Sequence, residues 1–311
     1  MGNNVVFQPP ECSYHPKEYD GELLWVPRES DNLVARLEQG IPCLLLQRPK
    51  AAHFLIFFHA NAEDLGQIYL LLRYLRTFLG VHVLAVEYPG YGICSGAPSE
   101  RQLLLDAETV LDFVQDALDV PLDRVLVMGR SMGGCPAIHL ASSFPVAGLV
   151  TLSAFSSIPD IVGAGIAGAS LMGLVFDRFD NASRMRTVSC PVLIVHGTDD
   201  GIIDVGHAHA LAETCGADVD GDPPVHLVLQ DGADHNDLDN KQDIIGPIKE
   251  AFPDLLEGEP LLLPEVEDIL QNQPKRLALD VQRRVPFRLG WVPHMLPFGK
   301  TKIISVDGEE I

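Results

Sequence analysis

Basic residues are scarce in this sequence, and several features that would assign a function quickly are missing. The 311 residues include 22 Lys and Arg against 43 Asp and Glu, which gives a formal net charge of -21 at pH 7. That balance excludes a protein that attracts nucleic acid through its overall charge, and we expect no nucleic-acid partner. No repeat of fixed period occurs, so fibrous and repeat architectures are excluded. Because 47% of the residues are hydrophobic, the chain is expected to fold around a large core.

Paired cysteines, a secretory signal and a long apolar run are also missing. The six cysteines are widely spaced, without a Cys-x-x-Cys pair for metal or redox chemistry. The first residues lack the succession of charged, apolar and small residues of a signal peptide, so we expect a cytoplasmic protein. The most membrane-like stretch, Ile161 to Phe176, is interrupted by glycines and falls short of the about 20 apolar residues of a spanning helix. We predict no transmembrane segment.

Short apolar runs alternate with segments of helical spacing through the middle of the chain. The runs predicted as buried strands are 54–58, 81–86, 125–128, 148–152, 192–195 and 225–229. The segments predicted as helices are 65–78, 99–117, 135–143 and 206–215. This alternation predicts an α/β fold with a mostly parallel central sheet and helices on both faces.

Three regions depart from the alternation. Residues 1–50 contain strand-like pieces at 23–26 and 42–47, which we expect at an antiparallel edge of the sheet. An apolar, Gly- and Ala-rich stretch within residues 158–186 is interpreted as a cap segment over a pocket. It contains a Gly-x-Gly-x-x-Gly string, but no strand precedes it, so a dinucleotide site is disfavoured. Residues 259–311 are interpreted as a C-terminal tail.

Ser131 is the candidate nucleophile. It lies in the string Gly129-Arg130-Ser131-Met132-Gly133, between a predicted strand and a predicted helix, where a Gly-x-Ser-x-Gly string forms a nucleophile elbow. The glycines are required because so sharp a reversal leaves no room for side chains beside the serine. A chance Gly-Ser turn is the alternative, and the strand-turn-helix context disfavours it.

A serine hydroxyl needs a histidine to accept its proton and a carboxylate to orient that histidine. The last two predicted strands are followed by Asp199 and Asp200 and by His235, at the strand ends where ligands bind in open α/β sheets. Both aspartates follow the same strand. We favour Asp200, because Ile202 and Ile203 can pin its loop, and interpret Asp199 as a solvated carboxylate. The chain order Ser, Asp, His is that of the α/β-hydrolase fold.

Acyl transfer also needs N–H donors for the oxyanion. In this architecture one comes from the residue after the nucleophile, here Met132, and one from the loop after an earlier strand. Asn61, just past the strand 54–58, is the candidate for the second. His207 and His209 are two residues apart on a predicted helix and so point to different faces, which disfavours a metal site. We expect no cofactor and no metal.

Seven segments, taken in order, resemble the alpha/beta-hydrolase-domain 17 group of serine hydrolases. They are Phe7-Gln8-Pro9-Pro10, 59–66, 87–92, 95–100, the Ser131 elbow, His196-Gly197-Thr198-Asp199-Asp200 and 232–237. The resemblance extends over roughly residues 7–240 and implies an α/β-hydrolase fold with a triad of Ser131, Asp200 and His235; we predict that the hydrolase domain spans residues 1–258. It also implies removal of S-acyl chains from palmitoylated proteins. The chain departs from the group in having only Cys12 in place of an N-terminal cysteine cluster, and Ala60 in place of a glycine.

The tail carries a basic, aromatic-bearing segment. Residues 275–302 contain seven Lys and Arg against one Asp, interleaved with aromatic and long apolar side chains. Such a segment can make peripheral contact with an anionic membrane surface, or it can dock on the acidic body of the protein, and both alternatives stay open. The start, Met1-Gly2-Asn3-Asn4, resembles an N-myristoylation site, but Val6 stands where Ser or Thr is expected.

These observations lead to one functional hypothesis and two alternatives. The sequence predicts a serine acyl hydrolase whose substrate is an S-acylated protein or another long-chain acyl thioester or ester, acting at the cytosolic face of a membrane. The first alternative is a small-ester or lipid carboxylesterase, since nothing in the sequence indicates the size of the acyl pocket. The second is a catalytically silent scaffold recruited to a membrane through the tail. The sequence does not indicate the oligomeric state.

Overall fold

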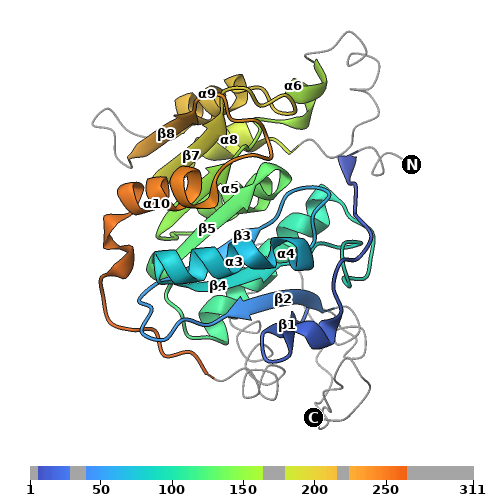
Figure 1. Cartoon of the computed structure of the whole chain (residues 1–311), viewed down its shortest axis with the longest axis vertical. Helices are drawn as coiled ribbons and strands as arrows, with labels where there is room; N and C mark the ends of the chain where they lie inside the picture. The colour runs from blue at the N-terminus through green and yellow to red at the C-terminus, as the bar shows by residue number, and fades with distance from the viewer. Residues whose placement is uncertain (1–5, 29–39, 164–178, 216–223, 265–311) are drawn as a thin grey trace, which may run out of the picture.

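One eight-stranded sheet forms the centre of the protein in a computed structural model, which describes residues 6–28, 40–163, 179–215 and 224–264 (Figure 1). The strand order is β1-β2-β4-β3-β5-β6-β7-β8. The strands are β1 Leu23–Val26, β2 Ile41–Leu46, β3 Phe54–Phe58, β4 His82–Val86, β5 Val125–Arg130, β6 Gly148–Leu152, β7 Val192–Gly197 and β8 Val225–Gln230. β2 pairs antiparallel with β1 and β4, and all other neighbours pair parallel. The mostly parallel sheet with an antiparallel edge is therefore confirmed.

Helices follow most of the parallel strands. They are α3 Leu65–Leu79, α4 Glu100–Asp116, α5 Gly134–Ser143, α6 Ile158–Gly163, α8 Asn181–Met185, α9 Gly206–Thr214 and α10 Gly246–Ala251. Helical turns of 3-10 type are η1 Pro16–Tyr19, η2 Leu122–Arg124, η3 Ser131–Gly133 and η6 Pro253–Leu256, and η5 Asn240–Ile245 is a π-helix. The predicted strands and helices are present, with ends that differ by one or two residues. η5 and α10 were not predicted, because Gly246 and Pro247, the first two residues of α10, interrupt the helical pattern.

Two hydrophobic cores lie on opposite faces of the sheet, because successive side chains of a strand point to opposite sides. Leu55 and Phe57 of β3 pack in one core with α3 and α10. Ile56 and Phe58 of the same strand pack in the other core with α4, α5 and α9. Figure 1 shows α3 and α10 on the same side of the sheet. Helices thus cover both faces, as predicted.

Two of the three regions outside the α/β alternation, the predicted cap and the predicted tail, are described only at their edges. Of the predicted cap at 158–186, α6 and residues 179–186 are described, and 164–178 lie outside the described residues. Of the predicted tail at 259–311, residues 259–264 are described, and the basic segment 275–302 lies outside them. Within the described ranges, none of the helices has the length and apolar character needed to cross a membrane.

Candidate active site

Ser131 lies at a strained turn between β5 and α5. Its φ of 51° falls in the left-handed region, which is costly for a residue with a side chain. A Cβ added to Gly129 would lie 2.0 Å from the carbonyl oxygen of Gly133, and one added to Gly133 would lie 2.2 Å from that of Phe58. Both glycines of the string are therefore sterically required. The elbow folds back on itself and packs against the carboxyl end of β3.

Ser131, His235 and Asp200 form a buried hydrogen-bonded network. His235 Nε2 lies 3.1 Å from Ser131 Oγ, and His235 Nδ1 lies 2.7 Å from Asp200 Oδ2. Because a carboxylate only accepts hydrogen bonds, Nδ1 carries the imidazole proton and Nε2 presents its lone pair to the serine hydroxyl. All three residues are buried, so little water competes for these hydrogen bonds.

The loop after β7 holds the Asp200 carboxylate in place. Its second oxygen, Oδ1, accepts the backbone N–H groups of Ile202 at 2.9 Å and Ile203 at 2.8 Å. Ile202 and Ile203 thus hold the loop through their backbone N–H groups, and the Ile203 side chain is also buried in a hydrophobic core. Asp199 is exposed, and its side chain does not contact His235. Of the two aspartates, Asp200, which the sequence analysis favours, is the one beside His235.

His196, at the end of β7, supports the same loop without adding charge. Its Nε2 lies 2.8 Å from the Ile203 carbonyl oxygen and 3.3 Å from Asp200 Oδ2. Burial lowers the pKa of His196, and it outweighs the opposite effects of the Ile203 carbonyl and the Asp200 charge. A neutral His196 leaves the charge of Asp200 to orient His235.

The loop after β3 lies against the elbow, but the Asn61 side chain is already occupied. Asn61 Oδ1 accepts hydrogen bonds from Gln8 N at 3.0 Å and Tyr91 Oη at 2.6 Å, and Nδ2 donates to Val6 O at 2.7 Å. The side chain therefore ties the N-terminal segment to this loop. The Asn61 backbone N–H has no hydrogen-bond partner among the described residues. This N–H and that of Met132 are the candidate oxyanion donors.

Ala60 does not strain the loop at the position where the resembled group has glycine. Its backbone N–H donates to Glu63 Oε2 at 3.0 Å. The left-handed residue of the loop is Ala62, with a φ of 60°, two positions further on. Position 60 therefore does not need the left-handed backbone conformations that glycine adopts readily.

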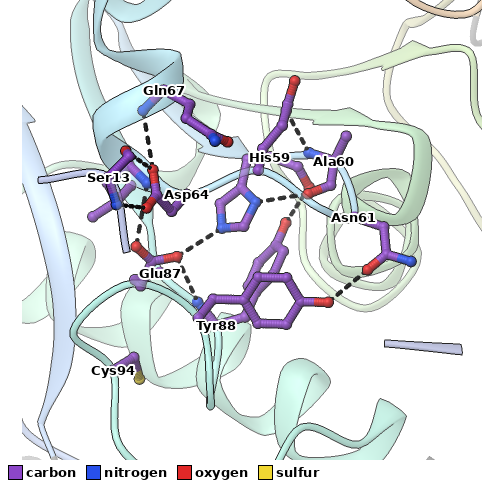
Figure 2. A network of polar contacts seen from close by, with 12 residues as sticks. Ser13, His59, Ala60, Asn61, Asp64, Gln67, Glu87, Tyr88 and Cys94 are labelled. Carbon is purple, nitrogen blue, oxygen red and sulfur yellow. Dashed lines mark hydrogen bonds and ion pairs between the residues drawn. The ribbon is translucent and has the colours of Figure 1, made fainter. Parts of the chain in front are cut away.

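A buried ion pair between His59 and Glu87 lies behind the loop (Figure 2). His59 Nε2 is 2.9 Å from Glu87 Oε1, and Nδ1 is 2.8 Å from the Ala60 carbonyl oxygen. Since both ring nitrogens face acceptors, both carry protons and His59 is an imidazolium. Burial alone lowers the pKa of His59, but the hydrogen bond and charge of Glu87 outweigh it and raise the pKa above its ordinary value.

Glu87 connects this ion pair to the N-terminal segment. Its Oε2 accepts from Tyr14 Oη at 3.0 Å and from the backbone N–H of Leu65 at 3.2 Å. Sequence reasoning missed the pair, although one signal was present. His59 directly follows β3 and Glu87 directly follows β4, and the carboxyl ends of these adjacent parallel strands meet at one edge of the sheet.

Comparisons with known proteins agree with this architecture. No family model matches the chain. "Alpha/beta hydrolase domain-containing protein aho-3" of Caenorhabditis elegans is 31% identical over 252 residues, which span 76% of this chain and 73% of that protein. "Alpha/beta hydrolase domain-containing protein 17B" of Homo sapiens is 31% identical over 258 residues, which span 77% of this chain and 86% of that protein.

Solved structures show the same fold at lower identity. The esterase Pf2001 of Pyrococcus furiosus superposes with a TM-score of 0.60 at 18% identity, covering 81% of this chain and 100% of that one. Alpha/beta hydrolase domain-containing protein 10 from mouse gives 0.54 at 17% identity, covering 75% and 99%. These likenesses show the α/β-hydrolase fold. The sequence identity to the curated relatives shows more: the chain belongs to the alpha/beta hydrolase domain-containing protein 17 family.

Proposed function

We propose that this protein is a serine acyl hydrolase that cleaves long-chain acyl thioesters or esters, with S-palmitoylated proteins as its substrates. The observation that carries the proposal is the buried network of Ser131, His235 and Asp200, with Ser131 in a left-handed turn at the end of β5. This arrangement activates a serine hydroxyl that is otherwise a weak nucleophile at neutral pH.

In the first half of the reaction, Ser131 Oγ attacks the carbonyl carbon of the acyl group, and its proton passes to His235 Nε2. The Nδ1–H of the resulting imidazolium stays bonded to Asp200, whose negative charge stabilises it. The backbone N–H groups of Asn61 and Met132 bind the oxyanion of the tetrahedral intermediate. Collapse of this intermediate breaks the carbonyl–sulfur or carbonyl–oxygen bond. The leaving thiolate or alkoxide takes the proton from His235, and the acyl chain remains on Ser131.

In the second half, water replaces the leaving group. His235 Nε2 removes a proton from a water molecule while its oxygen attacks the acyl-serine carbonyl carbon. The same backbone N–H groups bind the second oxyanion. Collapse breaks the bond to Ser131 Oγ, which recovers a proton from His235, and the carboxylic acid is released.

The choice of substrate rests on family membership, since the described residues do not define an acyl pocket. S-acylated proteins are the substrates that the resemblance implies. The basic segment 275–302 supports peripheral contact with the cytosolic face of a membrane, where such proteins are found.

Hydrolysis of a matched panel tests this proposal. The full chain and Ser131→Ala are assayed against a palmitoyl-cysteine peptide, a short-chain thioester and a short-chain p-nitrophenyl ester. We expect the highest kcat/KM for the palmitoyl thioester and no turnover by Ser131→Ala. A strong preference for the short ester would instead support a small-ester carboxylesterase. Absence of turnover on the whole panel would support a silent scaffold.

A further inference from the structure

Arg130, the residue before the candidate nucleophile, contacts two other loops of the site. Its Nη1 lies 2.7 Å from Glu63 Oε1 in the loop after β3. Its Nη2 donates to the His235 carbonyl oxygen at 3.1 Å and to Asn236 Oδ1 at 3.0 Å in the loop after β8. One guanidinium at the end of β5 therefore joins the oxyanion loop to the histidine loop.

We propose that Arg130 is a positioning residue, whose guanidinium sets the place of His235 and of the oxyanion loop relative to Ser131. The expected effect of Arg130 on kcat rests on the proposed function. The expected effect of Arg130 on the position of the loops does not depend on turnover. The Gly-x-Ser-x-Gly string does not determine the residue at position 130. The contacts of Arg130 with the two loops are therefore a feature of this chain and not of the string.

Glu63 carries the effect of Arg130 into the oxyanion loop. While Oε1 pairs with Arg130, Oε2 accepts the backbone N–H of Ala60 at 3.0 Å. The carboxylate thereby fixes the His59–Ala60 peptide, one peptide unit before the Asn61 N–H that is a candidate oxyanion donor. A charge-assisted hydrogen bond of this kind is stronger than a neutral one, and the side chains of Arg130 and Glu63 are only 17% and 23% exposed.

The shape of the guanidinium matters as much as its charge. Nη1 and Nη2 point to different loops, and a planar fork holds both directions at once. The ammonium of a lysine is a single point on a flexible stem and cannot hold both with the same geometry. Arg130→Lys is therefore expected to restore the charge without restoring the positioning.

Steady-state kinetics of the full chain on the palmitoyl thioester test the positioning role. We expect Arg130→Gln to lower kcat about 100-fold with little change in KM, as displacement of catalytic groups by an ångström does. We expect Arg130→Lys to recover less than half of the decrease in log kcat that Arg130→Gln causes. Arg184→Gln is the matched control, because Arg184 forms an ion pair of similar burial with Glu100 away from the triad. It should change kcat by less than twofold.

A double-mutant cycle tests whether Arg130 and Glu63 act together. If Arg130 acts on the oxyanion loop through Glu63, the double variant Arg130→Gln, Glu63→Gln loses no more kcat than Arg130→Gln alone. Additive losses would overturn this route. Equal kcat for wild type and Arg130→Gln, with wild-type turnover intact, would overturn the proposal while the proposed function stands.

A measurement without substrate keeps the two proposals distinguishable. The His235 Nδ1 proton, bonded to Asp200, is observed by proton NMR of the full chain, and its exchange with water reports how firmly the histidine loop is held. We expect faster exchange in Arg130→Gln and unchanged exchange in Arg184→Gln. This result with no turnover by wild type would support the positioning role and contradict the proposed function. Unchanged exchange in Arg130→Gln would overturn the positioning role.

Discussion

The two sides of the candidate active site are held in different ways. On the acid–base side, the loops after β7 and β8 are neighbours in the sheet and bond directly to each other, as in Asp199 N to Ala233 O at 3.0 Å and Gly201 N to Asp234 Oδ1 at 3.0 Å. On the oxyanion side, the loop after β3 is held by side-chain contacts to several separate segments of the chain. Asn61 binds the backbone of Val6 and Gln8, His59 binds Glu87, and Glu63 binds Arg130.

On the acid–base side each loop is supported by its neighbouring loop, whereas on the oxyanion side the support is spread over several segments of the chain. A substitution on the acid–base side changes the proton transfer between Ser131 and His235 directly. A substitution on the oxyanion side changes the rate indirectly, through the position of the loop after β3. Changes on the two sides should therefore differ in size, and the following experiments compare them from the largest expected effect to the smallest.

Loss of the Asp200 charge should have the largest effect. In Asp200→Asn the amide no longer holds His235 in the tautomer that accepts the serine proton, so kcat is expected to fall about 10,000-fold. Asp199→Asn is the matched control in the same loop and should change kcat by less than threefold, because Asp199 is exposed. Rate measurements on one acyl substrate decide this. Similar losses in both variants would contradict the assignment of Asp200.

A methyl group at Gly133 should disturb both sides at once. Its Cβ would lie 2.2 Å from the Phe58 carbonyl oxygen and 2.6 Å from that of His59, so the elbow and the oxyanion loop must separate. We expect kcat of Gly133→Ala to fall by about 100-fold or more. In Gly201→Ala the nearest atom is 3.9 Å away, and activity should be retained. Near-normal kcat for Gly133→Ala would mean that the loop need not touch the elbow.

Release of the N-terminal segment should affect the oxyanion side alone. Asn61→Ala removes the hydrogen bonds to Val6, Gln8 and Tyr91 but keeps the backbone N–H at position 61. We expect kcat to fall about tenfold, since one anchor of the loop is lost while Glu63 and His59 remain. Asn61→Asp keeps the acceptor for Gln8 and Tyr91 and should lose less. An unchanged kcat in Asn61→Ala would limit the N-terminal segment to a role in stability.

The His59–Glu87 pair should have the smallest effect on kcat, and its contribution should be visible in the stability of the fold. Because the pKa of His59 is raised in the folded state, its contribution is fully present below its unfolded value of about 6.5 and is lost as the pH rises through the folded pKa. We expect the free energy of unfolding of the wild type, relative to His59→Asn, to decrease over that range. Denaturant titrations at a series of pH values measure the difference. A difference that does not change with pH would mean that folding does not raise the pKa of His59, and a difference that increases with pH would mean that His59 is neutral in the folded protein.

The same contrast explains what could be predicted from the sequence. The strands, four helices and the acid–base side follow local patterns, such as a Gly-x-Ser-x-Gly string after a strand and Asp200 and His235 just past strand ends. The supports of the oxyanion side involve pairs such as Asn61 with Val6 and Arg130 with Glu63, separated by 55 and 67 residues. Only the folded chain brings such pairs together, so Asn61 is predictable as a loop residue but not as the anchor of the N-terminal segment.

Covalent labelling tests the central claim, that Ser131 is an activated nucleophile, most directly. The full-length protein is treated with a fluorophosphonate, and the modified residue is located by peptide mass spectrometry. The account predicts one adduct on Ser131, no adduct in Ser131→Ala, and strongly slowed labelling in His235→Ala, because His235 Nε2 is the group that accepts the serine proton. Undiminished labelling of Ser131→Ala would contradict it.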